Sequence, residues 1–518
     1  MQKYRYTIKD RIAALLVSAF ILITGMLSVT VGVPEWGDDF AAYMNEGIAI
    51  AEGDFHELTV MNYTMHPSQL SDEASEEGLV YVWGYPLLLA GIYRIVGFDR
   101  VDYSTVIFYK IPSMVSLALL GGVLVLFYRR RFPLAVSVTL SVLLCFSGEL
   151  FTAIDGLYSD LTFLFFSMLT LFLAEVFPEK TDEKRWGITA VFYGIVLWMT
   201  HEIRLNGMTV CAVAILGHSL FVFKNRKHIR KNLYWHHIIP YGIFALLTII
   251  TEHLWLAPAT SNMSDVGKAS ADIMAVNIVY YSEMIGSYLG SLFGFKVMVL
   301  GIIMVLFIIL GILFKGIKEN LHLTLLLLGT LIVDVMLPYE QGIRYIYNIL
   351  PLLLLFGSYG LAEIWKSVCN SVKKLPRKEL RIVGLVLLAL MLVLPVFNQM
   401  KIVANNMNHR GEVDQKDVYD PQAIDMYNYI QANVPEDCTI AFGKPRALYL
   451  NTDRMAFRTG FNGHRIYEAD YYLEYLISDS EFDYEAGEAS ITPMEPIYEN
   501  ESFRLYRVIE QNPDDQVN

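Results

Sequence analysis

The chain has 518 residues, of which 54% are hydrophobic and only 18% charged, and its mean hydropathy is +0.40. Soluble globular domains carry about 25% charged residues, so this composition excludes a soluble or disordered chain and predicts an integral membrane protein. The 53 acidic residues outnumber the 40 basic ones, and no basic patch appears. A nucleic-acid-binding protein is therefore excluded.

Eleven apolar runs in the first 400 residues have roughly the 20-residue length that a helix needs to cross about 30 Å of hydrocarbon. They lie at residues 12–33, 104–127, 133–151, 158–177, 187–201, 206–223, 237–256, 293–314, 321–337, 344–365 and 382–400. The first run is longer than a signal-peptide core, and Val33-Pro34-Glu35 offers no small-residue cleavage site, so we expect it to remain as an anchor. The pattern predicts an α-helical polytopic membrane module over residues 1–400.

Lysine and arginine gather on alternate connections between these runs. The basic segments are residues 3–11, 129–131, 180–185, 224–231, 315–318 and 366–381. Cytoplasmic loops carry such an excess, so these connections are predicted to be cytoplasmic. Eleven crossings then leave the amino terminus inside the cell membrane and residues 401–518 outside it.

Two long connections are predicted to lie outside. Residues 34–82 hold eleven carboxylates and neither Lys nor Arg, and residues 257–292 hold several tyrosines in a few helix-like turns. Both exceed the roughly two to eight residues of an ordinary helix connection, which indicates a role beyond linking helices.

The tail, residues 401–518, is predicted to form a small extracytoplasmic α/β domain. Asp420-Pro421 supplies a helix cap followed by a proline at the first helical position. Residues 438–442 read as a strand, 445–450 as a short helix and 503–509 as a closing strand. The cysteines Cys145, Cys211, Cys369 and Cys438 share no aqueous compartment in pairs, so free thiols are expected.

Ionisable residues gather at the predicted external ends of the crossings. A charge within the bilayer costs about 2.5–3.5 kcal/mol and is usually functional, so these positions are the candidate site. The group comprises Asp38, Asp39, Lys110, Glu149, Asp155, Asp160, His201, Glu202, Arg204, Glu252, His253, Asp334, Glu340 and Arg344. A coupled transporter would place such groups nearer the midplane, on broken helices.

Directly after the first crossing, Gly37 to Tyr43 opens a helical stretch that carries two adjacent carboxylates. Helical spacing places Asp39, Tyr43 and Glu46 on one face. Asp38 can serve as an N-cap, worth about 0.5–2 kcal/mol, and Asp39 can add a favourable dipole interaction. The spacing is equally compatible with catalytic carboxylates.

An acidic pair just outside the first crossing, followed by such a helix, resembles the integral-membrane glycosyltransferases of the GT-C fold. The resemblance is closest to the bacterial members of the family-39-like group, which includes protein O-mannosyltransferases and the aminoarabinose transferase of lipid A. Four further segments are similar to family motifs, and together the matches span residues 11–366. They are Trp83 to Ala90, Ser159 to Phe166, Arg204 to Gly207, and Arg344-Tyr345 with Pro351. Asp39 departs from the pattern, because many relatives carry Glu there, and the tail resembles only a subset of them.

The resemblance implies a fold of about 11 transmembrane helices and inverting transfer of a hexosyl or pentosyl group. The donor would be a polyprenyl-phosphate-linked sugar and the acceptor a hydroxyl of a lipid, glycan or protein outside the membrane. Because phosphate is a good leaving group, one carboxylate acting as general base can suffice. No cofactor is implied with certainty, and use of a divalent metal is left open.

By analogy, Asp38 is the first candidate for the base and Asp39 the second. Arginine binds phosphate with a planar fork, so Arg204 and Arg344 lead the lipid-phosphate candidates. Behind them come Lys110, Arg94 and His201. The acceptor or pocket candidates are Tyr43, Tyr85, Asp160, Glu252, His253 and Tyr345.

Structural alternatives remain open for the cations. Arg204 could pair with Glu202, Arg344 with Glu340 four residues earlier, and Lys110 with a nearby carboxylate. For the whole chain, the alternatives are a lipid or solute transporter and a non-catalytic membrane assembly protein.

Overall fold

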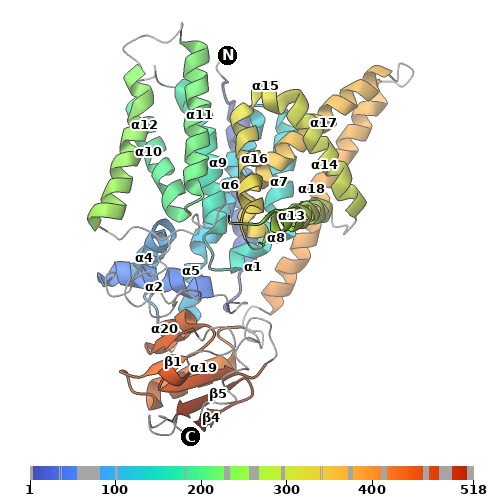
Figure 1. Cartoon of the computed structure of the whole chain (residues 1–518). Coiled ribbons are helices and arrows are strands. Elements are labelled where there is room, and N and C mark those ends of the chain that lie inside the picture. The colour runs from blue at the N-terminus through green and yellow to red at the C-terminus, as the bar shows by residue number, and fades with distance from the viewer. Residues whose placement is uncertain are drawn as a thin grey trace.

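The computed structural model describes residues 4–33, 36, 38–54, 82–99, 103–179, 181, 184–226, 234–255, 268–292, 298–338, 340, 342–371, 377–409, 417–458, 466–477 and 493–509. Helices run through most of the chain, and a small sheet follows near the carboxyl terminus (Figure 1). The predicted class, a polytopic helical membrane protein with a small α/β domain, is confirmed.

Each of the eleven predicted runs coincides with helix. In chain order these are α1 (Ile8–Ser28), α5 and α6 (Val106–Tyr109, Ile111–Arg129), α7 and α8 (Leu134–Cys145, Gly148–Thr152), α9 (Asp160–Val176), α10 (Trp186–Ile203), α11 (Gly207–Asn225), α12 with the π-helix η5 (Tyr234–Ile249, Ile250–Trp255), α14 (Met298–Gly311), α16 (Leu321–Val335), η8 with α17 (Ile343–Ile349, Leu350–Ser371) and α18 (Arg377–Asn408). Short elements join some of them: η1 (Tyr103–Thr105), η2 (Ala153–Asp155), η3 (Phe177–Glu179), η7 (Ile312–Gly316) and α15 (Ile317–Glu319).

Within the described ranges, eight helices are each long and apolar enough to cross a membrane. A further pair, α7 with α8 and η2, would make a ninth span bent by 60°. The other two predicted runs are α10, with 18 residues, and the shorter α16, with 15. The chain is thus a multi-pass membrane protein, and eleven crossings stay a prediction.

Three helices lie within or directly after the predicted external connections, at the end of the bundle that faces the sheet (Figure 1). They are α2 (Asp38–Glu52), α4 (Gly84–Val96) and α13 (Ala271–Ser291). Helices α2 and α4 pack together, with Gly47 directly against Leu89. The described part of the second connection, residues 268–292, holds the 21-residue α13, which is longer than the few turns expected. Ser270 caps α13 by accepting a hydrogen bond from the backbone of Ile273 (3.3 Å).

The carboxyl-terminal domain has a five-stranded sheet in the order β2-β1-β3-β5-β4. Strand β1 (Thr439–Ala441) pairs in parallel with β2 (Met455–Phe457) and β3 (Tyr471–Tyr475), and β5 (Phe503–Val508) pairs antiparallel with β3 and β4 (Met494–Glu499). Helices α19 (Pro421–Asn433) and α20 (Pro445–Thr452) and the short η10 (Ile466–Glu468) complete the domain. Asp420 caps α19 as predicted, by accepting from the backbone N–H groups of Gln422 and Ala423.

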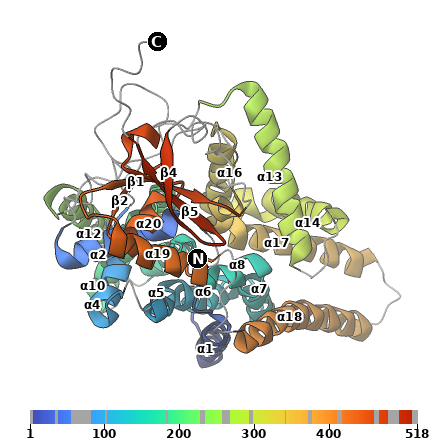
Figure 2. The same cartoon turned by 90° about the horizontal axis from the view of Figure 1, so that it is seen from below.

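The domain is fastened to the segment between α1 and α2. The buried Trp36 indole lies among four aromatic rings of the domain, at centroid distances of 5.7 to 6.5 Å. The Asp417 carboxylate accepts from the backbone N–H of Val33 (2.9 Å), and a Cβ at Gly32 would lie only 2.0 Å from it. Asn45 of α2 donates to the Arg446 carbonyl of α20 (3.2 Å). Seen from below, the domain overlies the region around α2 and leaves α13, α14 and α18 uncovered (Figure 2).

Three of the four cysteines have described side chains, namely Cys145, Cys211 and Cys438, and all three are free thiols, as expected. The Cys369 side chain lies outside the described residues. Residues 55–81 of the first connection, with several of its carboxylates, also lie outside them.

Candidate active site

Asp160 is the centre of a buried cluster of charges. It is the first residue of α9, its side chain is 2% exposed, and it accepts hydrogen bonds from two arginines. Arg204 binds one carboxylate oxygen through Nη1, and Arg344 binds the other through Nε (2.9 Å) and Nη2 (2.9 Å). Two guanidinium groups thus share one enclosed carboxylate.

Local backbone geometry explains how Arg204 reaches this place. Arg204 ends α10 in an extended conformation (φ −153°, ψ 141°), and the chain then turns into α11. Gly207 allows this turn, because a Cβ there would lie 1.9 Å from the carbonyl oxygen of Thr200. In the Arg-Leu-Asn-Gly motif, the arginine therefore binds Asp160 and the glycine permits the close turn that brings the arginine there.

Asp39 faces Arg344 from α2. One of its carboxylate oxygens lies 3.6 Å from Nη2 of Arg344, and its side chain is 43% exposed. Asp39 is therefore the accessible carboxylate of the site and Asp160 the enclosed one. Helix α2 begins at Asp38, whose side chain lies outside the described residues, so the predictions that it caps the helix or acts as the base stay untested.

Tyrosines surround the charged groups. The Tyr43 hydroxyl is 3.0 Å from Ser159 Oγ, and the ring of Tyr43 meets that of Tyr85 edge to face at 5.1 Å. Burial raises the pKa of Tyr43, so its hydroxyl stays protonated. The guanidinium of Arg204 lies 5.2 Å from the ring of Tyr345. These contacts hold the polar groups in fixed directions.

Sequence reasoning missed two neighbours of the cluster. The guanidinium of Arg344 lies 4.0 Å from the Tyr158 ring, a cation–π contact. Ser159 is the partner of Tyr43. Both stand immediately before Asp160, so an aromatic and a hydroxyl residue next to an interfacial carboxylate were the available signal.

Lys110 and Arg94 stand apart from this cluster. The ammonium of Lys110 is 1% exposed and pairs with Asp155 (2.7 Å), while it also donates to the carbonyls of Thr30 (3.1 Å) and Gly32. These contacts agree with the structural alternative for Lys110, in which its ammonium neutralises a nearby carboxylate. Arg94 is exposed in the last turn of α4, and no described contact joins it to Asp160.

The arginines do not make the local pairs considered from the sequence. Both bind Asp160, and among the described residues no ion pair joins Arg204 to Glu202 or Arg344 to Glu340. Helical i,i+4 pairing does not apply to Arg344, because its 3-10 helix η8 begins only at Ile343.

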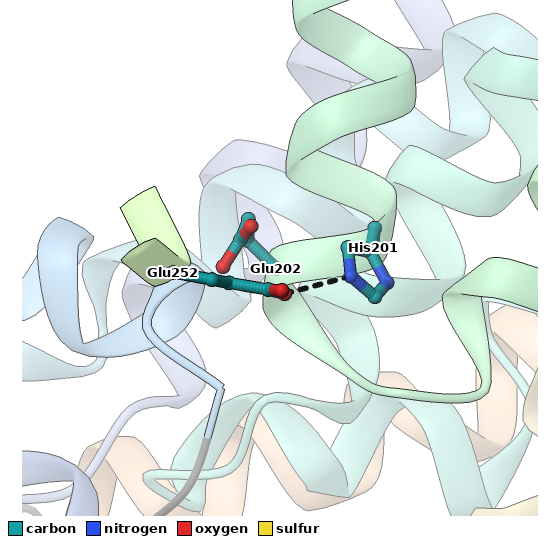
Figure 3. A group of neighbouring side chains, drawn as sticks. All are labelled: His201, Glu202 and Glu252. Atoms are coloured by element: carbon teal, nitrogen blue, oxygen red, sulfur yellow. Dashed lines mark hydrogen bonds and ion pairs between the residues drawn. The ribbon is translucent and has the colours of Figure 1, made fainter. Parts of the chain in front are cut away.

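The remaining candidates form a second cluster. His201 and Glu202 end α10, and Glu252 lies on η5 (Figure 3). His201 Nε2 is 3.0 Å from Glu252 Oε1, while the neighbouring His253 is exposed. No hydrogen bond or ion pair of the described residues joins this cluster to Asp160.

A bundle of membrane-length helices with an accessible carboxylate close after the first of them agrees with the GT-C resemblance of the sequence. Oligosaccharyltransferase AglB from Archaeoglobus fulgidus, solved with an inhibitory peptide and a dolichol-phosphate, has a TM-score of 0.60 and 12% identity, with 90% of this chain and 69% of that chain covered. ArnT from Cupriavidus metallidurans, bound to undecaprenyl phosphate, has a TM-score of 0.52 and 11% identity, with 95% and 97% covered.

The A. fulgidus enzyme in complex with Zn and sulfate is also similar, with a TM-score of 0.58, 12% identity, and 96% and 73% covered. These similarities confirm the predicted GT-C fold. No protein-family model and no curated protein matches the sequence.

Proposed function

We propose that this chain is an inverting glycosyltransferase that moves a sugar from a polyprenyl-phosphate carrier to an acceptor hydroxyl at the end of the bundle that carries the sheet domain. One observation carries the proposal: the accessible carboxylate of Asp39 lies beside Arg344, and Arg344 and Arg204 are both held by the enclosed carboxylate of Asp160. AglB and ArnT, which have the same fold, were solved with polyprenyl-type phosphates.

In this proposal Asp39 takes the proton of the acceptor hydroxyl. The acceptor oxygen forms a bond to the anomeric carbon, and the bond from that carbon to the phosphate oxygen breaks, leaving its electron pair on the polyprenyl phosphate. The phosphate needs no protonation, so a single base suffices, whereas a glycosidase needs two flanking carboxyl groups. Asp39 replaces Asp38 as our first choice because its carboxylate contacts Arg344.

The arginines would hold the departing phosphate. Arg344 is 33% exposed and Arg204 17%, so Arg344 is the better placed to reach a ligand, with Arg204 behind it. Asp160 would fix both guanidinium groups in advance, which lowers the cost of ordering them when the donor binds. Tyr43, Tyr85 and Tyr345 would shape the pocket.

We also infer the orientation in the membrane. Arg129 ends α6 and pairs with Asp10 near the start of α1, and the N-terminus lies at the end of the bundle away from the sheet domain (Figure 1). Arg130 and Arg131 follow it and pair with acidic residues of α9 and η3. Basic loops favour the cytoplasm, so the sheet domain, which follows α18, would be extracytoplasmic in a cell membrane. The accessible carboxylate would then act outside.

The test is turnover by the purified full-length protein with a panel of polyprenyl-phosphate sugars, scored as release of free polyprenyl phosphate. Loss of a general base costs about 10²- to 10⁴-fold, so Asp39→Asn should lower turnover by that factor. Asp54→Asn, which changes an exposed carboxylate after the same helix, is the matched control, and Asp38→Asn tests the other candidate. Near-normal turnover by folded Asp39→Asn protein would refute the base assignment.

If the wild type releases no polyprenyl phosphate from any donor, and moves a lipid or solute across liposomes without a covalent product, the transporter alternative holds instead. Helix α2, which carries Asp39, lies at the end of the bundle that faces the sheet domain (Figure 1), and this position favours the transferase.

A further inference from the structure

The cluster of His201, Glu202 and Glu252 has the composition and spacing of a cation site. Each residue offers one ligand atom, and these atoms lie within 4.8 Å of one another. They come from two elements, the end of α10 and the π-helix η5, and their side chains converge in Figure 3. π-Helical turns occur frequently at functional sites. Here the widened turn carries Glu252.

Glu202 is the second and independent observation. Its side chain is fully buried with the indole of Trp198 close by, and neither carboxylate oxygen makes a hydrogen bond of good geometry among the described residues. The Trp198 indole N–H donates to the hydroxyl of Thr251 (3.1 Å). Burying an ionised carboxylate without a partner is strongly unfavourable, and Glu252 brings a second negative charge. A bound cation would satisfy both.

The histidine adds selectivity. His201 is 6% exposed, and its Nδ1 has no partner among the described residues, while Nε2 faces Glu252. One imidazole and two carboxylates suit Zn²⁺, which binds such ligands at about 2.0–2.2 Å, whereas Ca²⁺ and Mg²⁺ prefer oxygen ligands alone. Gly84 of α4 packs directly against the backbone of Glu202, since a Cβ at Gly84 would lie only 2.6 Å from the Glu202 carbonyl carbon. This contact holds the Glu202 backbone in place.

We propose that His201, Glu202 and Glu252 bind one divalent transition-metal cation of the Zn²⁺ class, with a fourth ligand position open. The ion would join the end of α10 to the π-helix η5, which follows α12. Because Glu202 lies two residues before Arg204, it would also fix the start of the turn that presents Arg204 to Asp160. The proposal depends on these side chains alone and stands whether or not the chain transfers sugars.

The test is metal binding by the full-length protein, purified without a polyhistidine tag and stripped with a chelator. Calorimetric titration with ZnCl₂ should show one tight site per chain, and CaCl₂ and MgCl₂ should bind at least 100-fold more weakly. Glu202→Gln/Glu252→Gln should weaken Zn²⁺ binding by 100-fold or more. His253→Asn/Glu283→Gln, which changes the same residue classes at exposed positions, should leave it unchanged.

A local readout keeps the result independent of folding defects. Co²⁺ added to the stripped wild type should give visible absorption typical of a four-coordinate site, and Glu252→Gln alone, at a position 20% exposed, should abolish it without unfolding the chain. No Zn²⁺ binding by the wild type, or equal Zn²⁺ binding by the Glu202→Gln/Glu252→Gln protein, would overturn the proposal. In that case a protonated Glu202 beside a His201–Glu252 pair would describe the cluster.

Discussion

Replacement of Lys110 by methionine separates a structural role from a ligand-binding one. The ammonium makes its full set of three hydrogen bonds, to Asp155, Thr30 and Gly32, and is 1% exposed. Removing one partner of a buried pair costs about 3–5 kcal/mol. Asp155 keeps bonds from the N–H (2.9 Å) and hydroxyl (2.6 Å) of Thr30 and is 18% exposed, so the lower end applies. We expect about 3 kcal/mol, on the order of a hundredfold in the unfolding equilibrium.

The assay is unfolding of the purified protein in mixed detergent, followed by tryptophan fluorescence. The double variant Lys110→Met/Asp155→Asn should recover about half of the lost stability, because no buried charge is then left without a partner. Donor KM should not change in the folded Lys110→Met protein. If that protein is as stable as wild type and its donor KM rises tenfold or more, Lys110 binds the lipid phosphate and the structural reasoning is refuted.

Two further predictions concern the arginines and the domain junction. A hydrogen bond to a charged group contributes about 1.5–3 kcal/mol, so Arg344→Gln should raise the donor KM roughly 10- to 100-fold. Arg204 is less exposed than Arg344, so Arg204→Gln should raise the donor KM less. Equal effects of the two variants, or no effect, in steady-state kinetics would contradict the assignment. Burial raises the pKa of Asp417 from 3.8 to about 6 in the folded protein. The folded state therefore binds this proton more tightly than the unfolded state, so the contribution of Asp417 to the free energy of unfolding is fully present below about pH 4. That contribution, about 3 kcal/mol, is lost as the pH rises through 6. The amide of Asp417→Asn can still accept hydrogen bonds from the N–H groups of Val33 and Tyr419 and does not ionise. In unfolding experiments at several pH values, the variant should therefore be more stable than the wild type at pH 8 and equally stable near pH 4. A parallel pH dependence of the two proteins would refute this.

Local patterns predicted the fold well because they act over a few residues. Apolar runs became helices, and Asp420-Pro421 began a capped helix, since hydrophobic length and capping chemistry need no distant partner. Within the tail, the short helix predicted at 445–450 became α20, and the alternation at 503–509 located β5, for the same reason.

The candidate site was predictable only as a set of residues on one face. Asp160 and Arg344 are 184 positions apart, and no periodicity reports which distant cation meets which carboxylate. The local pairing of Arg204 with Glu202 was also plausible by spacing, but the extended backbone at Arg204 directs its side chain to Asp160. Packing decided between alternatives that spacing left equal.

The packing of Trp36 against the aromatic core of the sheet domain has a consequence for engineering this chain. Trp36 stands only three positions before Asp39, and its ring belongs to the core of a domain that begins almost four hundred residues later. A hybrid that exchanges the tail for that of a relative would keep Trp36 but lose the aromatic rings that enclose it, and α2 would lose its contact with α20. The two segments have to be exchanged together, and removal of the tail would disturb the segment that leads into α2 and Asp39 as well as removing the domain itself.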